Sequence, residues 1–172
     1  MRTSEGGTTL TVSGLLLGLS LFATSCKQQD PSEQLKPIVE QYLRAWNTGD
    51  FNGLENVVSS QFELRMSPRF DPVRGLDSLK RAITSWRTGY PDFTITVNEV
   101  LYSTDAVASR WTIHATNSGP GLMPPTGKSL VVPGMSIIHF SAGKITAEWI
   151  SGNDLAWVQQ LGFTLTPPGP GK

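Results

Sequence analysis

The sequence predicts an α+β domain in which helices come first and a curved antiparallel sheet follows. In the first half of the chain, apolar residues recur at three- and four-residue spacing, which is typical of amphipathic helices. After Pro91 the chain changes to alternating or β-branched runs separated by turn-forming segments, which is typical of strands. Helices followed by such a meander pack together on one face of the sheet.

The N-terminus has the pattern of a secretory signal. Leu10–Ala23 is an uncharged, largely apolar run that is too short to span a bilayer, with Arg2 before it and small residues after it. Cys26, the only cysteine, follows "LFATS", and this segment resembles a bacterial lipobox, whose cysteine is lipidated. We predict a signal peptide over residues 1–25 and a polar tether over 26–33. The protein would be an exported, membrane-anchored lipoprotein, periplasmic or on the outer membrane or cell surface. A plain secreted protein with a free thiol is the alternative.

One domain is predicted over residues 34–163, and its first part is helical. "SEQLKPIVEQYLRAWNTGD" presents one apolar helical face, and Gly49 is expected to end this helix. Asp50 is the predicted N-cap of a short second helix. The first strand is "SQFELRM", and after a turn-rich segment "LDSLKRAITSWRTG" restores the helical period up to Gly89.

The second part of the domain is a meander with a final helix. Its strands are "DFTITVNEVLY", "AVASRWTIHATN", "SLVVPGMSIIHF" and "KITAEWISG", and "LAWVQQL" is the helix. Both faces of the later strands are largely apolar, so one face is expected to pack on the helices and the other on a second copy, giving a homodimer. A thick single core is the alternative. Trp149 and Trp157 are expected in the core, and residues 164–172 have the composition of a disordered tail.

Composition and motifs exclude several classes of function. Acidic and basic residues balance at 14 each and form no basic cluster, so nucleic acid is not an expected partner. The sequence contains no CxxC pair, no GxSxG and no phosphate-binding glycine loop. His114 and His139 lie on separate predicted strands without the spacing of metal ligands, so we expect neither a metal site nor a cofactor.

Several segments in order resemble the SnoaL-like polyketide cyclases of the nuclear transport factor 2-like superfamily. They are "AWNTGD", "YPDF", "PPTGK", "GKI…EW" and "QQLG", and the resemblance runs from about Leu35 to Gly162. It implies a cone-shaped fold with a pocket between the helices and the concave sheet. In these cyclases the pocket holds a polyketide ester, and an acid/base carboxylate promotes an intramolecular aldol closure without metal or cofactor.

The resemblance also assigns candidate site residues. Aligned back from "QQLG", the position of the family's usual aspartate falls on Asn153, whose amide cannot act as a base. Asp154, one residue later, is the preferred base, with His139 as a second catalytic candidate. Helix capping is the alternative role for Asp154. Asn117, Asn153 and Trp111 are predicted to contact the ligand, although for Trp111 packing in the core is the favoured role, since large aromatic side chains usually bury for packing.

The predicted function is acid/base catalysis on a hydrophobic carbonyl compound. Removal of a proton next to a carbonyl needs a carboxylate whose pKa is raised in an apolar pocket, together with hydrogen-bond donors for the enolate. Where the family often has a glutamate this chain has Ala147, with Glu148 beside it. Because the chain departs from the family pattern at these positions, two other functions remain as alternatives. One is a non-catalytic lipoprotein that binds a small ligand in the same pocket, and the other is a purely structural dimer.

Overall fold

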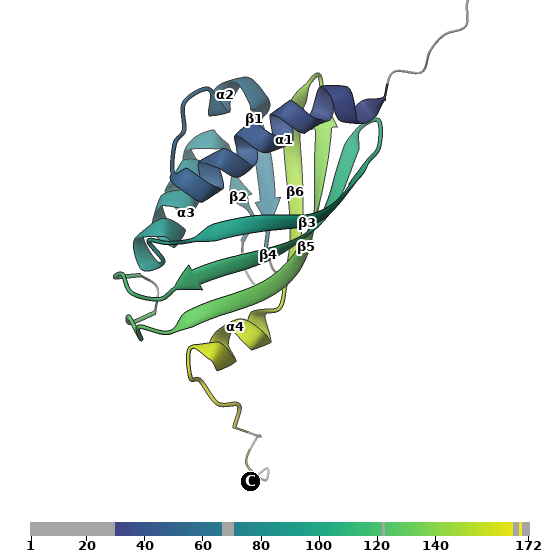
Figure 1. Cartoon of the computed structure of the whole chain (residues 1–172). Helices are drawn as coiled ribbons and strands as arrows, with labels where there is room; N and C mark the ends of the chain where they lie inside the picture. The colour runs from purple at the N-terminus through teal and green to yellow at the C-terminus, as the bar shows by residue number, and fades with distance from the viewer. Residues whose placement is uncertain (1–29, 67–70, 122, 167–168, 170–172) are drawn as a thin grey trace, which may run out of the picture.

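A computed structural model describes residues 30–66, 71–121, 123–166 and 169 (Figure 1). The helices are α1 (Pro31–Thr48), α2 (Leu54–Val57), α3 (Leu76–Gly89) and α4 (Asp154–Gln160). The strands are β1 (Val58–Arg65), β2 (Val73–Arg74), β3 (Thr94–Tyr102), β4 (Ala106–Thr116), β5 (Ser129–Ser141) and β6 (Lys144–Gly152). The predicted signal peptide and the lipidation site Cys26 lie outside the described residues, and they stay predictions.

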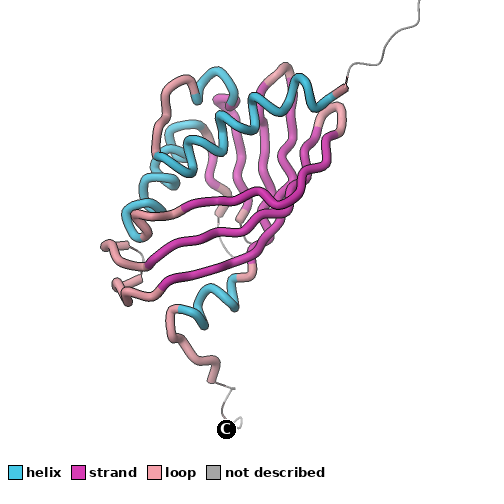
Figure 2. The backbone as a smooth tube through the Cα atoms, viewed as in Figure 1, coloured by secondary structure: helices cyan, strands magenta, loops and turns pink. Residues whose placement is uncertain are grey.

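The strands form one sheet in the order β2-β1-β6-β5-β4-β3. The meander from β3 to β6 is antiparallel, whereas β1 pairs with β6 in parallel. Figure 2 shows that the sheet bends strongly, so that β3, β4 and β5 run across the direction of β1 and β6. Helix α1 lies over the concave side (Figure 1). The predicted α+β arrangement, with helices packed on one face of a curved sheet, is confirmed.

Helix α1 begins earlier than the predicted domain boundary. The Asp30 side chain accepts a hydrogen bond from the Ser32 backbone N–H at 2.9 Å, and Pro31 occupies the first turn, where proline is well tolerated. Residues 31–33 of the predicted tether therefore belong to the helix. Gly49 ends the helix in the left-handed conformation (φ 75°), as the sequence predicts.

The predicted N-cap of the second helix is wrong. Helix α2 begins at Leu54 after Gly53, which adopts a positive φ of 71°. Asp50 lies further upstream, and its carboxylate accepts a hydrogen bond from the Asn52 backbone N–H at 3.0 Å. Asp50 thus fixes the turn between the helices, because an aspartate side chain readily bonds to the backbone two residues ahead.

The core lies between the helices and the concave face of the sheet. Its fully buried members include Phe62, Leu79, Ile83 and Ile145. Trp157 on α4 is buried as predicted, but Trp149 is 58% exposed, and its predicted place in the core is wrong. Side chains alternate along a strand, and Trp149 belongs to the outer face of β6, next to the Arg65 guanidinium at 5.9 Å.

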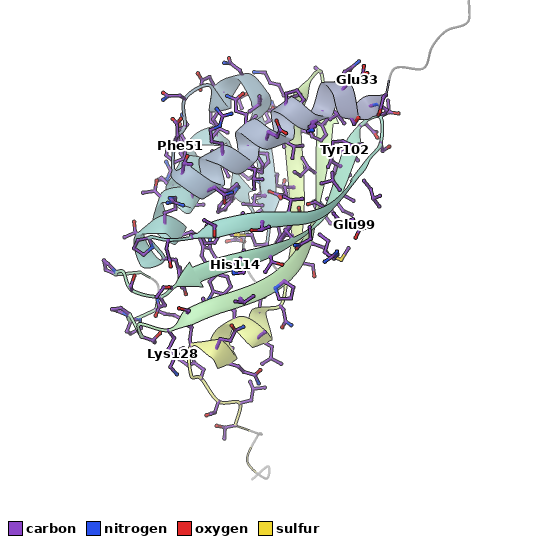
Figure 3. The ribbon with its side chains drawn as sticks, viewed as in Figure 1. Glu33, Phe51, Glu99, Tyr102, His114 and Lys128 are labelled. Carbon is purple, nitrogen blue, oxygen red and sulfur yellow. The ribbon has the colours of Figure 1, made fainter. Side chains whose placement is uncertain are left out.

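The outer face of the sheet carries an exposed apolar surface. We call Leu101, Met135, Ile137 and Trp149 the outer apolar surface; their side chains are 47–65% exposed. An ion pair between Glu99 and Arg110, at 3.2 Å, lies on the same face, and Figure 3 shows Glu99 on this side of β3. Within the described part of the chain, no helix has the length and apolar character needed to cross a membrane.

Candidate functional site

A cavity of about 480 Å³ lies between α1, α3, α4 and the concave face of the sheet. Its walls are mainly apolar and include Val39, Leu43, Trp46, Ile95, Ile113 and Ile138. The volume falls within the range of roughly 300–1,000 Å³ that is usual for small-molecule sites. An apolar wall of this kind stabilises an apolar ligand by removing its surface from water.

One carboxyl group, that of Glu148, is buried in this wall. Glu148 is only 5% exposed, and its Oε2 accepts a hydrogen bond from the Tyr42 hydroxyl at 2.6 Å. Burial raises the pKa of Glu148 to about 7, although hydrogen bonds from Tyr42 and Ser136 act in the opposite direction. At neutral pH this carboxyl group is close to half-protonated, so it can both accept and donate a proton.

Tyr42 is held in its neutral, donating form. Burial, and then the charge of the neighbouring Glu148, raise the pKa of the Tyr42 hydroxyl well above its ordinary value. Tyr42 lies on the apolar face of α1, the same face that carries Leu35 and Trp46 into the core. The helical period therefore brings a hydroxyl group from the first helix onto a carboxyl group of the last strand.

Two serines and a tryptophan extend this polar region. The Ser136 hydroxyl accepts a hydrogen bond from Trp111 Nε1 at 3.3 Å, and its Oγ lies 3.1 Å from the Ser109 Oγ. Ser136 and Glu148 also share a hydrogen bond. We call Glu148, Tyr42, Ser136, Ser109 and Trp111 the polar cluster. All five side chains line the cavity, so a ligand with one polar end can meet them together.

Sequence reasoning missed Glu148, although one signal pointed to it. Glu148 has the same strand parity as Ile150, and both line the cavity. The sequence does not show which face of β6 meets the helices, and a register shift between His139 and Phe140 interrupts the alternation along this strand pair. The orientation of Glu148 therefore follows from the tertiary pairing of β5 with β6.

The catalytic candidates from the sequence lie in different places. Asp154 lines the cavity with an exposed side chain at the first residue of α4, so it is available to a ligand. His139 is exposed on the outer face of β5, because strand alternation points it away from Ser136 and Ile138, which line the cavity. The structure therefore does not bring Asp154 and His139 together, and we leave His139 out of the site.

The ligand-binding candidates also separate. Trp111 lines the cavity, as described above. Asn117 is buried, but its Oδ1 accepts the Thr126 backbone N–H at 2.8 Å and so holds the loop before β5. The Asn153 Oδ1 accepts the Ala156 backbone N–H at 3.0 Å, which makes Asn153 the N-cap of α4. Both amide oxygens are engaged in local structure, and neither residue lines the cavity.

The capping role of Asn153 gives a direct prediction. Replacing Asn153 with alanine should lower the free energy of unfolding by about 1 kcal/mol, because the Ala156 N–H loses its partner at the helix start. Asn153→Asp retains the acceptor and should unfold like the wild type. Urea denaturation of the three proteins measures the effect. Equal denaturation midpoints for all three would show that this cap contributes nothing to the free energy of unfolding.

Metal-binding residues do not cluster in the described part of the chain. Over residues 30–66, 71–121, 123–166 and 169, no group of three or more histidine, cysteine, aspartate or glutamate side chains is placed to hold a metal ion. The residues that line the cavity include the carboxyl groups of Glu148 and Asp154, together with hydroxyl and indole hydrogen-bonding groups.

Solved structures share this fold. TsrD from Streptomyces laurentii superposes with a TM-score of 0.67 at 24% identity over 76% of this chain and 96% of that one. IdmH from Streptomyces antibioticus, a candidate polyketide cyclase, gives a TM-score of 0.62 at 21% identity over 76% and 99%. A candidate SnoaL-like polyketide cyclase from Jannaschia sp. CCS1 gives 0.67 at 20% identity over 81% and 99%.

The family assignment comes from the sequence together with this fold. No curated protein matches the chain. The family model of the SnoaL-like polyketide cyclases matches residues 36–161, which span the domain from α1 to the end of α4. The predicted nuclear transport factor 2-like cone is thereby confirmed, and the chain belongs to the SnoaL-like polyketide cyclase family.

Proposed function

We propose that this protein acts on a small hydrophobic carbonyl compound by cofactor-independent acid/base catalysis, with Glu148 as the base. The observation that carries the proposal is a buried carboxyl group, with a pKa of about 7, in the wall of a mainly apolar cavity. Such a group combines a usable fraction of the ionised form with strong basicity at neutral pH.

The proposed step is removal of a proton from the carbon next to the carbonyl group. The C–H bond breaks, the proton passes to the Glu148 carboxylate, and the electron pair forms an enolate. The Ser109 hydroxyl is the nearby donor that can stabilise the enolate oxygen, because Ser136 donates its single O–H to the Glu148 carboxylate. Glu148 can then return its proton, which gives exchange or isomerisation, or the enolate can attack a second carbonyl and close a ring.

Asp154 remains the second candidate for the base. Its side chain reaches the cavity from the start of α4, but it is exposed to water, whereas Glu148 is enclosed by protein. Desolvation is what makes a carboxylate basic enough to remove a carbon-bound proton, so the enclosed group is favoured. Substitution of each residue in turn separates the two assignments.

The test is deuterium uptake at the α-carbon of an aromatic β-keto ester in D₂O, followed by NMR. The protein begins at Lys27, and wild type is compared with Glu148→Gln and Asp154→Asn. Exchange that is lost only in Glu148→Gln supports the proposal, and exchange that is lost only in Asp154→Asn transfers the role to Asp154. Absence of exchange above background with the wild type contradicts catalysis on this substrate class.

A non-catalytic, ligand-binding function is the second candidate. It is favoured by one observation: the position of the family's usual aspartate is Asn153, and the side chain of Asn153 is engaged in capping α4. The cavity would then hold a small apolar carbonyl compound, with Glu148 and Ser136 as hydrogen-bonding partners. Ligand signals that shift on protein addition in the same NMR samples, without deuterium uptake, would support this function.

We also propose that the outer apolar surface is covered by a second copy of the chain. Exposed apolar surface of this kind marks contact sites, and the neighbouring Glu99–Arg110 pair supplies both signs of charge, which is compatible with the self-complementary contact of a two-fold dimer. Trp149→Glu should convert a dimer into a monomer in size-exclusion chromatography with light scattering. Leu165→Glu, which changes an exposed residue beyond α4, is the matched control, and a dimeric Trp149→Glu would contradict the proposal.

A further inference from the structure

We propose that the Ser136 hydroxyl is a positioning group whose hydrogen bond reverses when Glu148 takes up a proton, so that the Ser109 hydroxyl is released towards the cavity in the same step. This inference rests on the proposed function and deepens it, because it couples proton removal by Glu148 to the hydrogen bond that the enolate oxygen needs. Three features support it: the row of side chains across the sheet, the count of donors and acceptors, and the different exposure of the two serines.

The register of the sheet places the three side chains in a row. Ser109 on β4 is the direct partner of Ser136 on β5, and their Oγ atoms are 3.1 Å apart. Glu148 on β6 pairs with Ile138, two residues along β5 from Ser136, so Ser136 and Glu148 are diagonal neighbours. These two side chains share a hydrogen bond, and all three polar residues line the cavity. Three adjacent strands thus carry one hydrogen-bonded chain across the concave face.

The outer donors of this chain have a fixed direction. The Trp111 indole can only donate, and its Nε1 gives its hydrogen to Ser136 at 3.3 Å. Tyr42 donates to Glu148 Oε2 at 2.6 Å, and the raised pKa of Tyr42 keeps this hydrogen on the hydroxyl group. A serine hydroxyl, by contrast, donates one hydrogen, accepts two and rotates to suit its neighbours. The links between Ser109, Ser136 and Glu148 are therefore the reversible ones.

When Glu148 is ionised, the number of hydrogens determines the direction of the chain. A carboxylate only accepts, so Ser136 donates its single hydrogen to Glu148. The Ser136 oxygen then accepts from Trp111 Nε1 and from Ser109, whose hydrogen is thereby directed away from the ligand. Within the described part of the chain, no Lys, Arg or His side chain lines the cavity, so hydroxyl donors of this kind stabilise the buried charge.

Proton uptake by Glu148 reverses the chain. The C–H bond of the ligand breaks, its proton forms the new O–H bond of Glu148, and the electron pair remains on the ligand as an enolate. The new O–H donates to the Ser136 oxygen, so the Ser136 hydrogen turns to the Ser109 oxygen. Ser109 becomes an acceptor, and its own hydrogen can turn into the cavity. These changes are rotations about C–O bonds, and no proton passes between the serines.

The exposure of the two serines fits this coupling. The other four members of the polar cluster are 3–6% exposed, whereas Ser109 is half-buried. The Ser109 hydroxyl is therefore the one in the cluster that is most open to a ligand oxygen. A donor that becomes available as the enolate charge develops stabilises the transition state more than the ground state. Ser109 thus meets the enolate oxygen, and Ser136 acts on the reaction through Ser109.

Neutron diffraction locates these hydrogens without any ligand. Crystals of the same protein as in the exchange experiment are transferred to D₂O at pH 5 and at pH 9, on either side of the Glu148 pKa of about 7. At pH 9 the deuterium on Ser136 should point to Glu148. At pH 5 it should point to Ser109, and Glu148 should carry a deuterium of its own. A Ser136 deuterium that keeps one direction at both pH values overturns the inference.

The other titratable groups around Glu148 are controlled in the same experiment. Among the described residues that line the cavity they are Tyr42 on α1 and Asp154 on α4, whereas the β1 partner of Glu148 is the apolar Leu64. Tyr42 keeps its hydrogen at both pH values, because its pKa is raised. Asp154→Asn is the matched carboxyl control. It should show the same reversal at Ser136, and a reversal that disappears in Asp154→Asn would overturn the assignment to Glu148.

The rate of deuterium exchange tests whether the two serines act as one unit. Ser136→Ala and Ser109→Ala should each lower kcat by about 10²- to 10³-fold, the usual loss for one oxyanion donor, and leave KM nearly unchanged. Because both act on one hydrogen bond, the double variant should be no slower than the slower single variant. Ser136→Thr, which keeps the hydroxyl group, should restore most of the rate. Ser136→Ala should also move the pH profile to higher pH, since the ionised Glu148 loses a donor.

These experiments separate the inference from the proposed function. Reversal of the Ser136 deuterium upholds the inference, and absence of exchange in the wild type then contradicts only the proposed catalysis. Exchange in the wild type with a fixed Ser136 deuterium overturns the inference and leaves catalysis by Glu148 intact. Rate losses that multiply in the double variant also overturn it, because the two serines would then act independently. Ser109→Ala with the wild-type rate overturns it as well.

Discussion

Replacing Glu148 with glutamine should lower the rate of deuterium exchange by about 10²- to 10⁴-fold, the usual contribution of a general base. Glutamine keeps the shape of the side chain and can still accept the hydrogen bond from Tyr42. Its amide cannot accept a proton from carbon at neutral pH. The loss therefore reports on proton transfer and leaves the packing of the cavity nearly unchanged.

The dependence of exchange on pH provides an independent check of the same assignment. The active form of the base is the ionised carboxylate, and the pKa of Glu148 is about 7. The exchange rate should therefore rise with pH up to about this value and then level off. Asp154→Asn is the matched carboxylate control and should keep both the rate and the profile. A profile that survives in Glu148→Gln would show that another group removes the proton.

The same carboxyl group should make the stability of the protein fall as the pH rises. In the unfolded chain Glu148 titrates near its ordinary pKa of 4.5, whereas in the folded protein burial raises the pKa to about 7. Between these values the folded state binds more protons than the unfolded state, so the free energy of unfolding decreases with pH. The cost is absent below pH 4.5 and complete above pH 7, where it reaches about 3 kcal/mol.

Urea denaturation of wild type and Glu148→Gln between pH 4 and pH 8 measures this effect. The variant cannot titrate at position 148, so its stability relative to the wild type should improve by about 3 kcal/mol from pH 4 to pH 8. Glu55→Gln, at an exposed position on α2, controls for the general effect of removing a carboxylate. A difference between wild type and Glu148→Gln that is constant over this range would contradict the raised pKa.

Much of the fold could be predicted from the sequence, because local patterns determine it. The helical period of α1 and α3 and the alternation of the meander are properties of short segments. The parallel pairing of β1 with β6 could not be predicted. It joins Val58 to Ile145, which are far apart in the sequence, and no local pattern specifies which distant strand becomes a neighbour.

The site was predicted only in part, for a related reason. The polar corner after β6 was found, and Asp154 does line the cavity there. Glu148 was overlooked as a candidate base because its pKa depends on burial and on Tyr42, which lies 106 positions earlier in the chain. Asn117 was expected to face the ligand, but its amide oxygen holds the backbone of its own loop. The sequence alone does not show that the backbone of the loop occupies the Asn117 side chain, because this hydrogen bond depends on the folded conformation of the loop.

The order of strands in the sheet has a consequence for the assembly of the protein during synthesis. The last strand to leave the ribosome, β6, lies between β1 and β5, so the early and late halves of the sheet stay apart until it is inserted. Pairings between distant segments form slowly, since a long loop must close first. A nascent chain that ends before Lys144 lacks Glu148 and leaves both neighbouring strand edges open, and open edges favour aggregation. Completion of the cavity and completion of folding are therefore the same event, and a chain truncated before Lys144 lacks the strand that carries Glu148 into the cavity wall.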